Sequence, residues 1–464
     1  MLYLQHYSKG VYGMQKIKML SITITVGLFL ILMGCSNSSD NSDSSQSENQ
    51  LKVVYVSNNT WDSVFEYLKE SFESENEEVE VELVPISGNN EEDQRTKIAL
   101  MRQSQEKFDV VFQVFSSLKN DIDAGYLQSI DSVREDWSGY DQIVDSLTEP
   151  YIADDQLYGL PISATVRGMF YNSNMFDEAG ITENSETWDP ESWDDIKDAM
   201  QQIDENFEEK YPIYYASAKA SGEGAVLQSF LMFLSGTDDW IFEDSKWIVE
   251  SQGLYDSFKW IEDTREYNGT PKVLTNPNGW QTVQYEWMPN EEVGMVLEGA
   301  WITNSWVEGS PGECEECQDI YKLAPMPKQN GNGNAGITNT SSLAVSSTAE
   351  SPELAKEFIK HALTKENSIE IAGILDQVPV REDALESSEF KENTPNADIA
   401  LNLLESAIYP PSDPNYPTVA MEIQEAMEKI TVQGQSAEEV MKEFAINVER
   451  TVGEDNVIRK SYNK

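Results

Sequence analysis

The sequence is poor in the residues that most often carry catalysis or bind metals. Its 464 residues include two histidines, His6 and His361, and three cysteines, Cys35, Cys314 and Cys317. A Ser-His-Asp hydrolase site would depend on His361 alone, on what is predicted to be a surface helix. A zinc site lacks a second cysteine pair. We therefore expect no metal and no cofactor.

Basic residues are also scarce. The chain has 32 Lys and Arg against 82 Asp and Glu, and removal of residues 1–34, which hold three lysines and no acid, gives a formal charge of −53. Such a surface excludes nucleic acid and anionic membranes as partners. A hydrophobic fraction of 39% with 10% aromatics is that of a folding chain. The acids indicate a solvated surface, as in a salty or alkaline habitat; a cationic ligand is the alternative.

The one long apolar run, Met19–Met33, is short for a membrane-spanning helix. Lys16 and Lys18 precede it, so it predicts a signal peptide over residues 1–34, with Met14 as an alternative start. Gly34-Cys35 resembles the end of the bacterial lipobox, which implies a lipid on Cys35; an ordinary signal peptide with a chance cysteine is the alternative. Residues 36–50 are polar and form a tether. We expect the protein on the outer face of the cell membrane, held by lipid only.

Cys314 and Cys317 are separated by two glutamates in a loop flanked by Gly and Pro. Outside the cytoplasm this spacing favours a small local disulfide. A redox motif would need a helix N-terminus, which Pro311-Gly312 does not supply.

The first third of the chain alternates strands and helices. Strands are predicted at 51–57, 79–83 and 109–114, with helices at 62–75 and 91–104. This order predicts a parallel sheet covered by helices. Ligands bind outside the carboxyl ends of such strands. Those ends are 58–61, 87–90 and 113–117.

Further elements follow without a long internal repeat. Strands are expected at 166–171, 293–297, 321–325 and 343–345. Helices are expected at 225–235, 253–267, 353–363, 419–432 and 437–452.

Several short segments, in this order, resemble the extracellular solute-binding proteins of ABC sugar importers, the maltose- and trehalose-binding type. They are Phe108-Asp-Val110, Leu157-Tyr-Gly-Leu-Pro161, Met169-Phe-Tyr-Asn172, Gly299-Ala-Trp301, Leu323-Ala-Pro-Met-Pro327, Ser351-Pro-Glu-Leu-Ala-Lys-Glu-Phe358 and Val378-Pro-Val-Arg381. The resemblance spans nearly the whole chain after the signal peptide.

The resemblance implies an α/β fold of two Rossmann-like lobes joined by a multi-segment hinge, the type II periplasmic-binding-protein architecture. We place the first lobe at 51–161 plus 336–376 and the second at 162–335 plus 377–464. The expected function is capture of a sugar or oligosaccharide between the lobes and delivery to the membrane subunits of an ABC importer. A monomer is expected.

A sugar site needs flat aromatic rings for stacking and planar polar groups for hydrogen bonds. Trp301 is the first candidate, since Gly299 and Ala300 let a ligand approach and the family places a stacking tryptophan here. Arg381 occupies a segment that contacts ligand in related proteins; a surface ion pair is the alternative. Trp61 follows the first strand and either lines the cleft or packs on the lobe.

Other candidates depend on position alone. Arg167 lies in the first crossing segment and reaches either the ligand or an acid across the hinge. Asn89 and Asp93 follow the second strand, where turn residues are the alternative. Gln113 stands where the family commonly has an aspartate, which leaves the identity of the sugar open. Gly336 is placed near the ligand, and Trp280 and Trp287 are extra stacking faces or packing residues.

Two motifs carry no function. Gly331-Asn-Gly333-Asn-Ala-Gly336 matches G-x-G-x-x-G but opens no helix, so it lacks the dinucleotide-binding context. Carboxylate pairs arise by chance among 82 acids, so they do not indicate a glycosidase. We expect a binding protein and no enzyme. A binder of a polyol, polyamine or compatible solute and a surface glycoside hydrolase are the alternatives.

Overall fold

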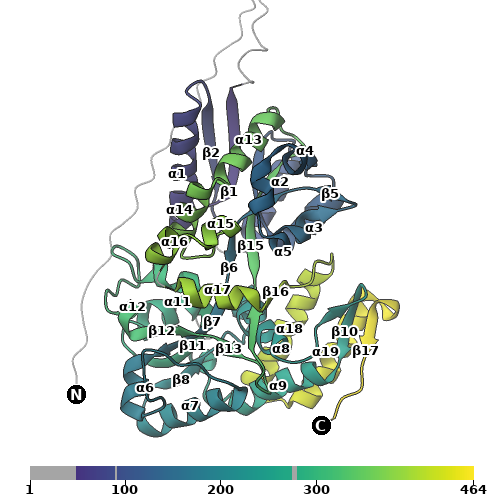
Figure 1. Ribbon diagram of the computed structural model, residues 1–464. Helices are drawn as coiled ribbons and strands as arrows, with labels where there is room; N and C mark the ends of the chain where they lie inside the picture. The colour runs from purple at the N-terminus through teal and green to yellow at the C-terminus, as the bar shows by residue number, and fades with distance from the viewer. Residues whose placement is uncertain (1–48, 89–90, 274–278, 395, 464) are drawn as a thin grey trace, which may run out of the picture. The chain divides into compact units, whose positions relative to one another are not determined.

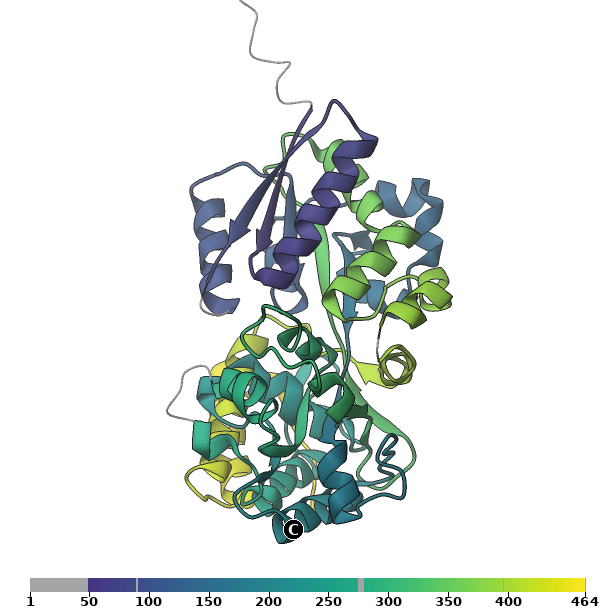
Figure 2. The same cartoon turned by 90° about the vertical axis from the view of Figure 1, so that its left-hand side faces the viewer.

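A computed structural model describes residues 49–88, 91–273, 279–394 and 396–463, which form two lobes (Figures 1 and 2). Each lobe is built on one main sheet, of strand order β2-β1-β3-β15-β6 and β12-β7-β11-β8 respectively. The first sheet consists of β1 (Gln50–Val56), β2 (Glu80–Ile86), β3 (Val110–Val114), β6 (Leu160–Thr165) and β15 (Asn339–Val345). The second consists of β7 (Arg167–Asn172), β8 (Tyr211–Tyr214), β11 (Val293–Gly299) and β12 (Tyr321–Ala324).

The start of the first lobe confirms the predicted parallel sheet. Strand β1 pairs in parallel with β2 and with β3. Helix α1 (Asn59–Glu75) buries Val64, Phe65, Leu68 and Phe72, the face that its apolar spacing predicts. Helix α2 (Glu91–Gln103) precedes β3. The carboxyl ends of β1 and β3 therefore meet at one edge of the sheet.

The second lobe contains the predicted C-terminal helices. Helix α19 (Ala437–Val452) begins at a capping box of Ser436 and Glu439, and it packs on α18 (Tyr416–Thr431) and α9 (Gln252–Thr264). The helix predicted at 225–235 is instead a π-helix, η4 (Ala225–Phe230), followed by α8 (Leu231–Ser235). A second π-helix, η5 (Val283–Trp287), follows α11 (Gly279–Thr282).

Within the described residues, three connections run between the two lobes. They run from β6 to β7, from β14 (Asn334–Ile337) to β15, and from α16 (Ser388–Asn393) to α17 (Ala397–Glu405). The first two connections are hydrogen-bonded to each other. Thr165 Oγ1 donates to Asn339 O at 2.9 Å, and Thr338 Oγ1 donates to Thr165 O at 3.0 Å.

The predicted lobe boundaries differ from these contacts in two places. The boundary at 161 falls inside β6, which belongs to the first sheet. Helices α15 (Glu382–Leu385) and α16 follow the boundary at 377, yet both pack against α14 (Lys365–Leu375), which packs on α1. The reason is a small apolar cluster that includes Ile369, Ala384 and Phe390.

The remaining elements are short or peripheral. The helices are α3 (Phe115–Asp123), α4 (Asp131–Asp136), α5 (Asp145–Thr148), α6 (Ser173–Ala179), α7 (Trp193–Asn206), α10 (Thr270–Val273), α12 (Cys317–Ile320) and α13 (Pro352–Ala362), with 3-10 turns η1 (Ser138–Gln142), η2 (Glu149–Tyr151), η3 (Lys219–Ser221), η6 (Ala300–Ser305) and η7 (Glu454–Asn456). The strands are β4 (Ile152–Ala153), β5 (Gln156–Leu157), β9 (Phe242–Glu243), β10 (Lys246–Glu250), β13 (Met326–Pro327), β16 (Ala407–Ile408) and β17 (Val457–Arg459).

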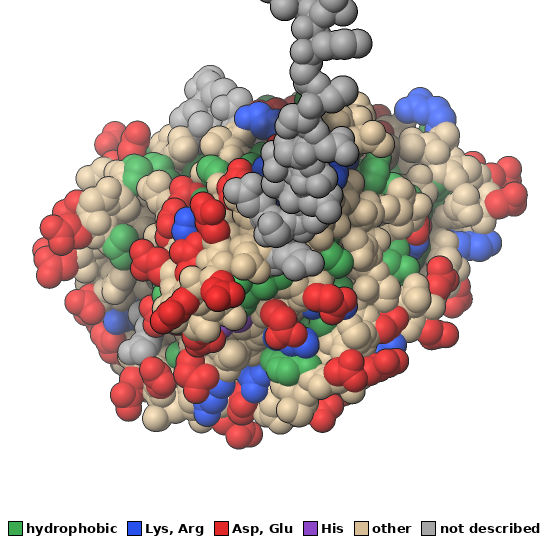
Figure 3. All heavy atoms as spheres, turned by 90° about the horizontal axis from the view of Figure 1, so that it is seen from above, with side chains coloured by type: hydrophobic (Ala, Val, Ile, Leu, Met, Phe, Trp, Pro, Cys, Tyr) green, Lys and Arg blue, Asp and Glu red, His purple; other side chains and the backbone are tan. Residues whose placement is uncertain are grey.

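The surface reflects the excess of acids. Figure 3 shows carboxylate side chains spread over the face seen from above, with fewer Lys and Arg among them. Within the part of the chain that the structure describes, no helix has the length and apolarity to span a bilayer. Cys35 and the predicted tether to residue 48 lie outside the described residues.

Candidate functional site

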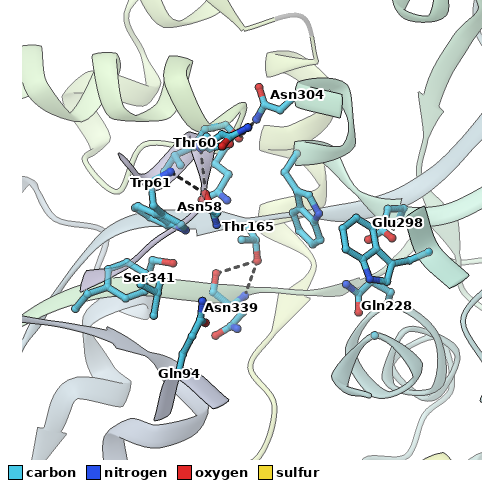
Figure 4. Close-up of a pocket in the computed structure, with 18 of the residues that line it drawn as sticks. Asn58, Thr60, Trp61, Gln94, Thr165, Gln228, Glu298, Asn304, Asn339 and Ser341 are labelled. Carbon is cyan, nitrogen blue, oxygen red and sulfur yellow. Dashed lines mark hydrogen bonds between the residues drawn. The ribbon is translucent and has the colours of Figure 1, made fainter. Parts of the chain in front are cut away.

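A cavity of about 940 Å³ lies where the two lobes meet. The first lobe contributes the start of α1, part of α2 and Gln113 of β3, and the second contributes both π-helices and the segment after β11. Figure 4 shows Trp61 on one side, Gln228 and Glu298 on the other, and Thr165 and Asn339 of the crossing strands between them. Two of the three predicted strand ends, 58–61 and 113, thus reach the cavity.

Trp61 is held at the cavity wall by the cap of its own helix. Asn58 Oδ1 accepts hydrogen bonds from the backbone N–H of Thr60 at 3.0 Å and of Trp61 at 2.9 Å. The indole packs edge-on against Phe112, with ring centroids 4.6 Å apart, and also lines the cavity. Both interpretations of Trp61 therefore hold: the ring packs on the lobe and borders the cleft.

Trp301 lines the cavity from the second lobe and is half-buried. Its ring lies so close over Gly299 that a Cβ there would be 1.8 Å from the indole Cζ3. The guanidinium carbon of Arg167 is 5.1 Å from the indole centroid. Arg167 itself is buried and donates to Thr165 Oγ1 and to Ile337 O at 3.0 and 3.2 Å. Arg167 is not among the residues that line the cavity, so it contacts the side of Trp301 that faces away from the cavity.

Glu298 is a buried carboxylate on the cavity wall. Oε1 accepts from Gly299 N at 3.0 Å, and Oε2 accepts from Gln284 Nε2 at 3.5 Å. Burial raises the pKa of Glu298 above its usual range, against the lowering effects of the Gly299 N–H, the Arg167 charge and the two glutamines, Gln228 and Gln284.

The lining combines aromatic rings, neutral amides and few charges. The aromatic residues are Trp61, Phe112, Tyr126, Tyr214, Trp280, Tyr285 and Trp301. The amides are Asn58, Asn59, Gln94, Gln113, Asn120, Gln228, Gln284, Asn304, Asn339 and Gln377. The charged residues are Arg102, Asp121 and Glu298, of which Arg102 and Asp121 form an ion pair at 2.6 Å.

Three lining amides carry oxygens that accept no hydrogen bond from any described residue. They are Gln228 Oε1, Asn339 Oδ1 and Gln377 Oε1, and all three are buried. A buried acceptor without a donor costs about 1–3 kcal/mol. A ligand that brings hydroxyl donors to these amides would recover that free energy.

The structure places Arg381, which was predicted to contact the ligand, away from the cavity. Its guanidinium donates to both oxygens of Asp383, at 2.9 and 2.8 Å, and to Leu363 O at 2.9 Å, away from the cavity. This pairing holds the pKa of Asp383 below its usual range. Gln377 lines the cavity instead. The backbone of the next residue, Val378, is hydrogen-bonded to that of Ala164 in β6, and after it the chain leads away from the cavity.

Other position-based predictions also miss the cavity. Gly336 packs against Ala407 of β16, where a Cβ would be 3.0 Å from the Ala407 Cα. Asp93 borders a separate hollow near Gly88. Trp287 stacks on Tyr211 with centroids 4.0 Å apart. Asn89 lies outside the described residues.

Sequence reasoning missed Glu298 and most of the lining amides, such as Gln228, Gln284 and Gln377. Glu298 precedes Gly299 directly, so the same segment that indicates Trp301 could have indicated it. Trp280, weighed as packing, lines the cavity and is 40% exposed. Gln228 and Gln284 had no local signal, because π-helical register cannot be read from apolar spacing.

Cys314 and Cys317 form a disulfide, with Cα atoms 5.4 Å apart. The bridge closes the end of the loop that begins after η6. Ser310 and Pro311 of this loop line the cavity. The disulfide therefore constrains a loop that forms part of one wall of the site.

One hydrogen-bonded chain has the order of a hydrolase triad. Ser71 Oγ is 2.8 Å from His361 Nε2, and His361 Nδ1 is 3.1 Å from Glu75 Oε2. Ser71 lies inside α1, where the backbone N–H groups are used by the helix, so no oxyanion hole can form there. Among the described residues no group of His, Cys, Asp and Glu is arranged to hold a metal ion.

Comparison with known proteins gives one family. A model of the family described as bacterial extracellular solute-binding protein matches residues 67–397. The arabinooligosaccharide-binding protein of Bacillus subtilis (strain 168) is 24% identical over 259 residues. That alignment covers 54% of this chain and spans about half (55%) of the relative.

Solved structures show the same fold. Maltose-bound MalE3 of T. maritima superposes with a TM-score of 0.73 at 16% identity, covering 87% of this chain and all of the other. The sugar-binding protein MalE of Xanthomonas citri gives a TM-score of 0.73 at 18% identity, covering 86% and 96%. These likenesses confirm the predicted two-lobed type II architecture.

Proposed function

The chain belongs to the bacterial extracellular solute-binding proteins, and on that basis we propose that it captures a neutral oligosaccharide outside the cell and delivers it to an ABC importer. The curated relative from B. subtilis binds arabinooligosaccharides, and the structural neighbours named above are maltose- or sugar-binding proteins. These names support a sugar as the ligand class.

The lining of the cavity carries the proposal. Trp61 from the first lobe and Trp301 from the second offer flat faces to sugar C–H surfaces, and Trp280 adds a third ring at an exposed position. The amides supply paired donors and acceptors for hydroxyl groups. A volume of about 940 Å³ lies at the upper end of the usual range of about 300–1,000 Å³, which favours more than one sugar ring.

The balance of charge favours a neutral ligand. Arg102 and Asp121 neutralise each other at 2.6 Å, and Glu298 lies close to the positive charge of Arg167. An anionic ligand would find no uncompensated cation in the described lining, and the acid open to a cationic ligand, Glu298, already accepts hydrogen bonds from Gly299, Gln284 and Gln228.

Ligand capture would shift the two lobes toward a closed arrangement that the importer recognises. The described contacts between η6 and the end of α14 suit this role. Thr303 Oγ1 donates to Asp376, and Asn304 Nδ2 donates to Leu375 O at 2.9 Å. Because Asn304 and Leu375 also line the cavity, a ligand there would touch both partners of the contact.

The proposal includes a monomer that stays at the membrane through a lipid on Cys35, with residues 36–50 as the tether. The lipid would serve retention only, and the binding domain would act in solution. No catalysis is proposed. Of the two acids among the described lining residues, Asp121 is paired with Arg102, so this part of the lining does not offer a glycosidase two available carboxylates.

A cationic solute is the second candidate, favoured by Glu298 among aromatic rings, an arrangement that also suits quaternary ammonium groups. Titration calorimetry of the soluble domain separates the two. We expect binding of at least one of maltotriose, mannotriose and arabinotriose, and none of glycine betaine or spermidine. Binding of betaine or spermidine alone would overturn the sugar proposal, and release of reducing sugar during the titration would indicate an enzyme.

A further inference from the structure

Glu298 accepts more hydrogen bonds than a carboxylate that borders a cavity by chance would be expected to accept. It is the penultimate residue of β11, is 8% exposed, and accepts hydrogen bonds from the Gly299 N–H and from the side chains of Gln284 and Gln228. A carboxylate has about four acceptor positions, so three donors leave it able to accept again. Its burial is not fully compensated by these donors and by Arg167, since its pKa remains raised.

The hydrogen bond to Glu298 fixes how Gln228 is oriented. An amide approaches a carboxylate with its Nε2, because two oxygens would repel each other. Oε1 of Gln228 therefore points away from Glu298, and it accepts no hydrogen bond from the described residues. Gln284 differs, because its Oε1 already accepts from Ser305 Oγ at 3.0 Å. Glu298, which can accept one more hydrogen bond, and Gln228 Oε1, which accepts none from the described residues, are thus two neighbouring acceptors (Figure 4).

Both glutamines come from π-helical segments. Gln228 lies in η4 and Gln284 in η5. A π-turn is rare, shifts the register of the side chains that follow, and occurs frequently at functional sites. Two separate segments with this irregular geometry place a glutamine against the same carboxylate, Glu298.

We propose that Glu298 and Gln228 form an acceptor pair that selects the sugar ring stacked on Trp301 by two hydroxyl donors on its edge. The inference rests on the proposed function and adds a specificity-determining element to it. Glu298 and Trp301 flank Gly299-Ala300, so one short segment would contact both the face and the edge of the same sugar ring. A ring that lacks either hydroxyl would leave a buried acceptor unsatisfied and bind more weakly.

The test is calorimetric titration of three variants with whichever of maltotriose, mannotriose and arabinotriose the unaltered protein binds most tightly. Glu298→Gln keeps the shape but loses the charged acceptor. Gln228→Met keeps the length but loses the amide. We expect each to weaken binding at least about tenfold. The control, Glu286→Gln, changes the same charge at an exposed position of the same η5 segment, and its affinity should stay within about twofold.

Melting temperatures accompany each titration. Gln228→Met carries the test if Glu298→Gln does not fold. Wild-type affinity in the folded variants would overturn the acceptor pair while leaving the proposed function intact. If the unaltered protein binds none of the three trisaccharides, the proposed function fails, and the inference fails with it.

Discussion

The guanidinium of Arg167 lies against the ring of Trp301, 5.1 Å from its centroid. Arg167 donates hydrogen bonds to Thr165 of β6 and Ile337 of β14, which lie at the first two connections between the lobes. The ring that is proposed to stack on sugar is therefore positioned by the hinge itself. One face of the indole is covered by the cation, and a ligand would stack on the face toward the cavity.

Gly299→Ala should weaken sugar binding at least about tenfold without unfolding the protein. The backbone of Gly299 has φ −81° and ψ 155°, which any residue adopts, so the effect would be one of space alone. The added Cβ would be 1.8 Å from the indole and must displace it. Calorimetry and melting temperature measure the two quantities separately. Gly373→Ala, in α14 with no atom within 4 Å of the new Cβ, is the control. Equal affinities in the two variants would contradict the assigned position of Trp301.

Arg381→Ala should lower stability and leave sugar affinity within about twofold. The truncation removes the partner of Asp383 and the hydrogen bond to Leu363 O, a loss of about 1–3 kcal/mol. Urea unfolding beside calorimetry checks both. A variant of normal stability that no longer binds sugar would restore Arg381 as a ligand contact.

Asp376 should make stability depend on pH in a direction opposite to that of a salt-bridged acid. Burial raises its pKa from 3.8 to about 6, so the folded protein binds its proton more tightly than the unfolded chain does. Its contribution is therefore most favourable below about pH 4 and is lost as the pH rises through about 6. Asp376→Asn keeps the acceptor for Thr303 and suits the left-handed backbone at φ 47°.

This variant should be more stable than the unaltered protein at pH 7.5, by up to about 3 kcal/mol, and the difference should shrink toward pH 4.5. Urea unfolding at several pH values measures it. Asp319→Asn, at an exposed position, serves as the charge control. A difference that is constant with pH would show that Asp376 keeps an ordinary pKa.

Added salt should stabilise the domain, because its surface charge is strongly one-sided (Figure 3). The expected range is from about 0.1 M to 1 M, where the screening length falls from about 10 Å to about 3 Å. Denaturation midpoints in sodium chloride and potassium chloride should rise alike. A flat response would exclude self-repulsion, and saturation with one cation would indicate a specific ion site.

The sequence predicted those elements whose apolar spacing is regular. The parallel strands β1, β2 and β3 and the helix α19 follow from period and capping, and Trp61 and Gln113 follow from the rule that ligands bind at carboxyl ends of strands. Trp301 was identified through the resemblance together with the small residues before it. Each of these signals is local.

What could not be predicted depends on contacts between distant segments. The π-helices that carry Gln228 and Gln284 look like ordinary helix in sequence. Arg381 was misplaced because family position does not reveal that Asp383, two residues on, takes its guanidinium. Gln377 gave no signal, since its place on the cavity wall depends on the pairing of the next residue, Val378, with Ala164.

The most direct test of the account is calorimetric titration of Trp301→Ala with the trisaccharide that the unaltered protein binds, beside its melting temperature. Stacking adds about 0.5–1.5 kcal/mol beyond the apolar area, and truncation of a central aromatic often costs about 2 kcal/mol or more. We expect affinity to fall at least about tenfold in a folded variant, and less in Trp301→Phe, which keeps a flat face. Unchanged affinity with a melting temperature that collapses would make Trp301 a packing residue and contradict the proposed site.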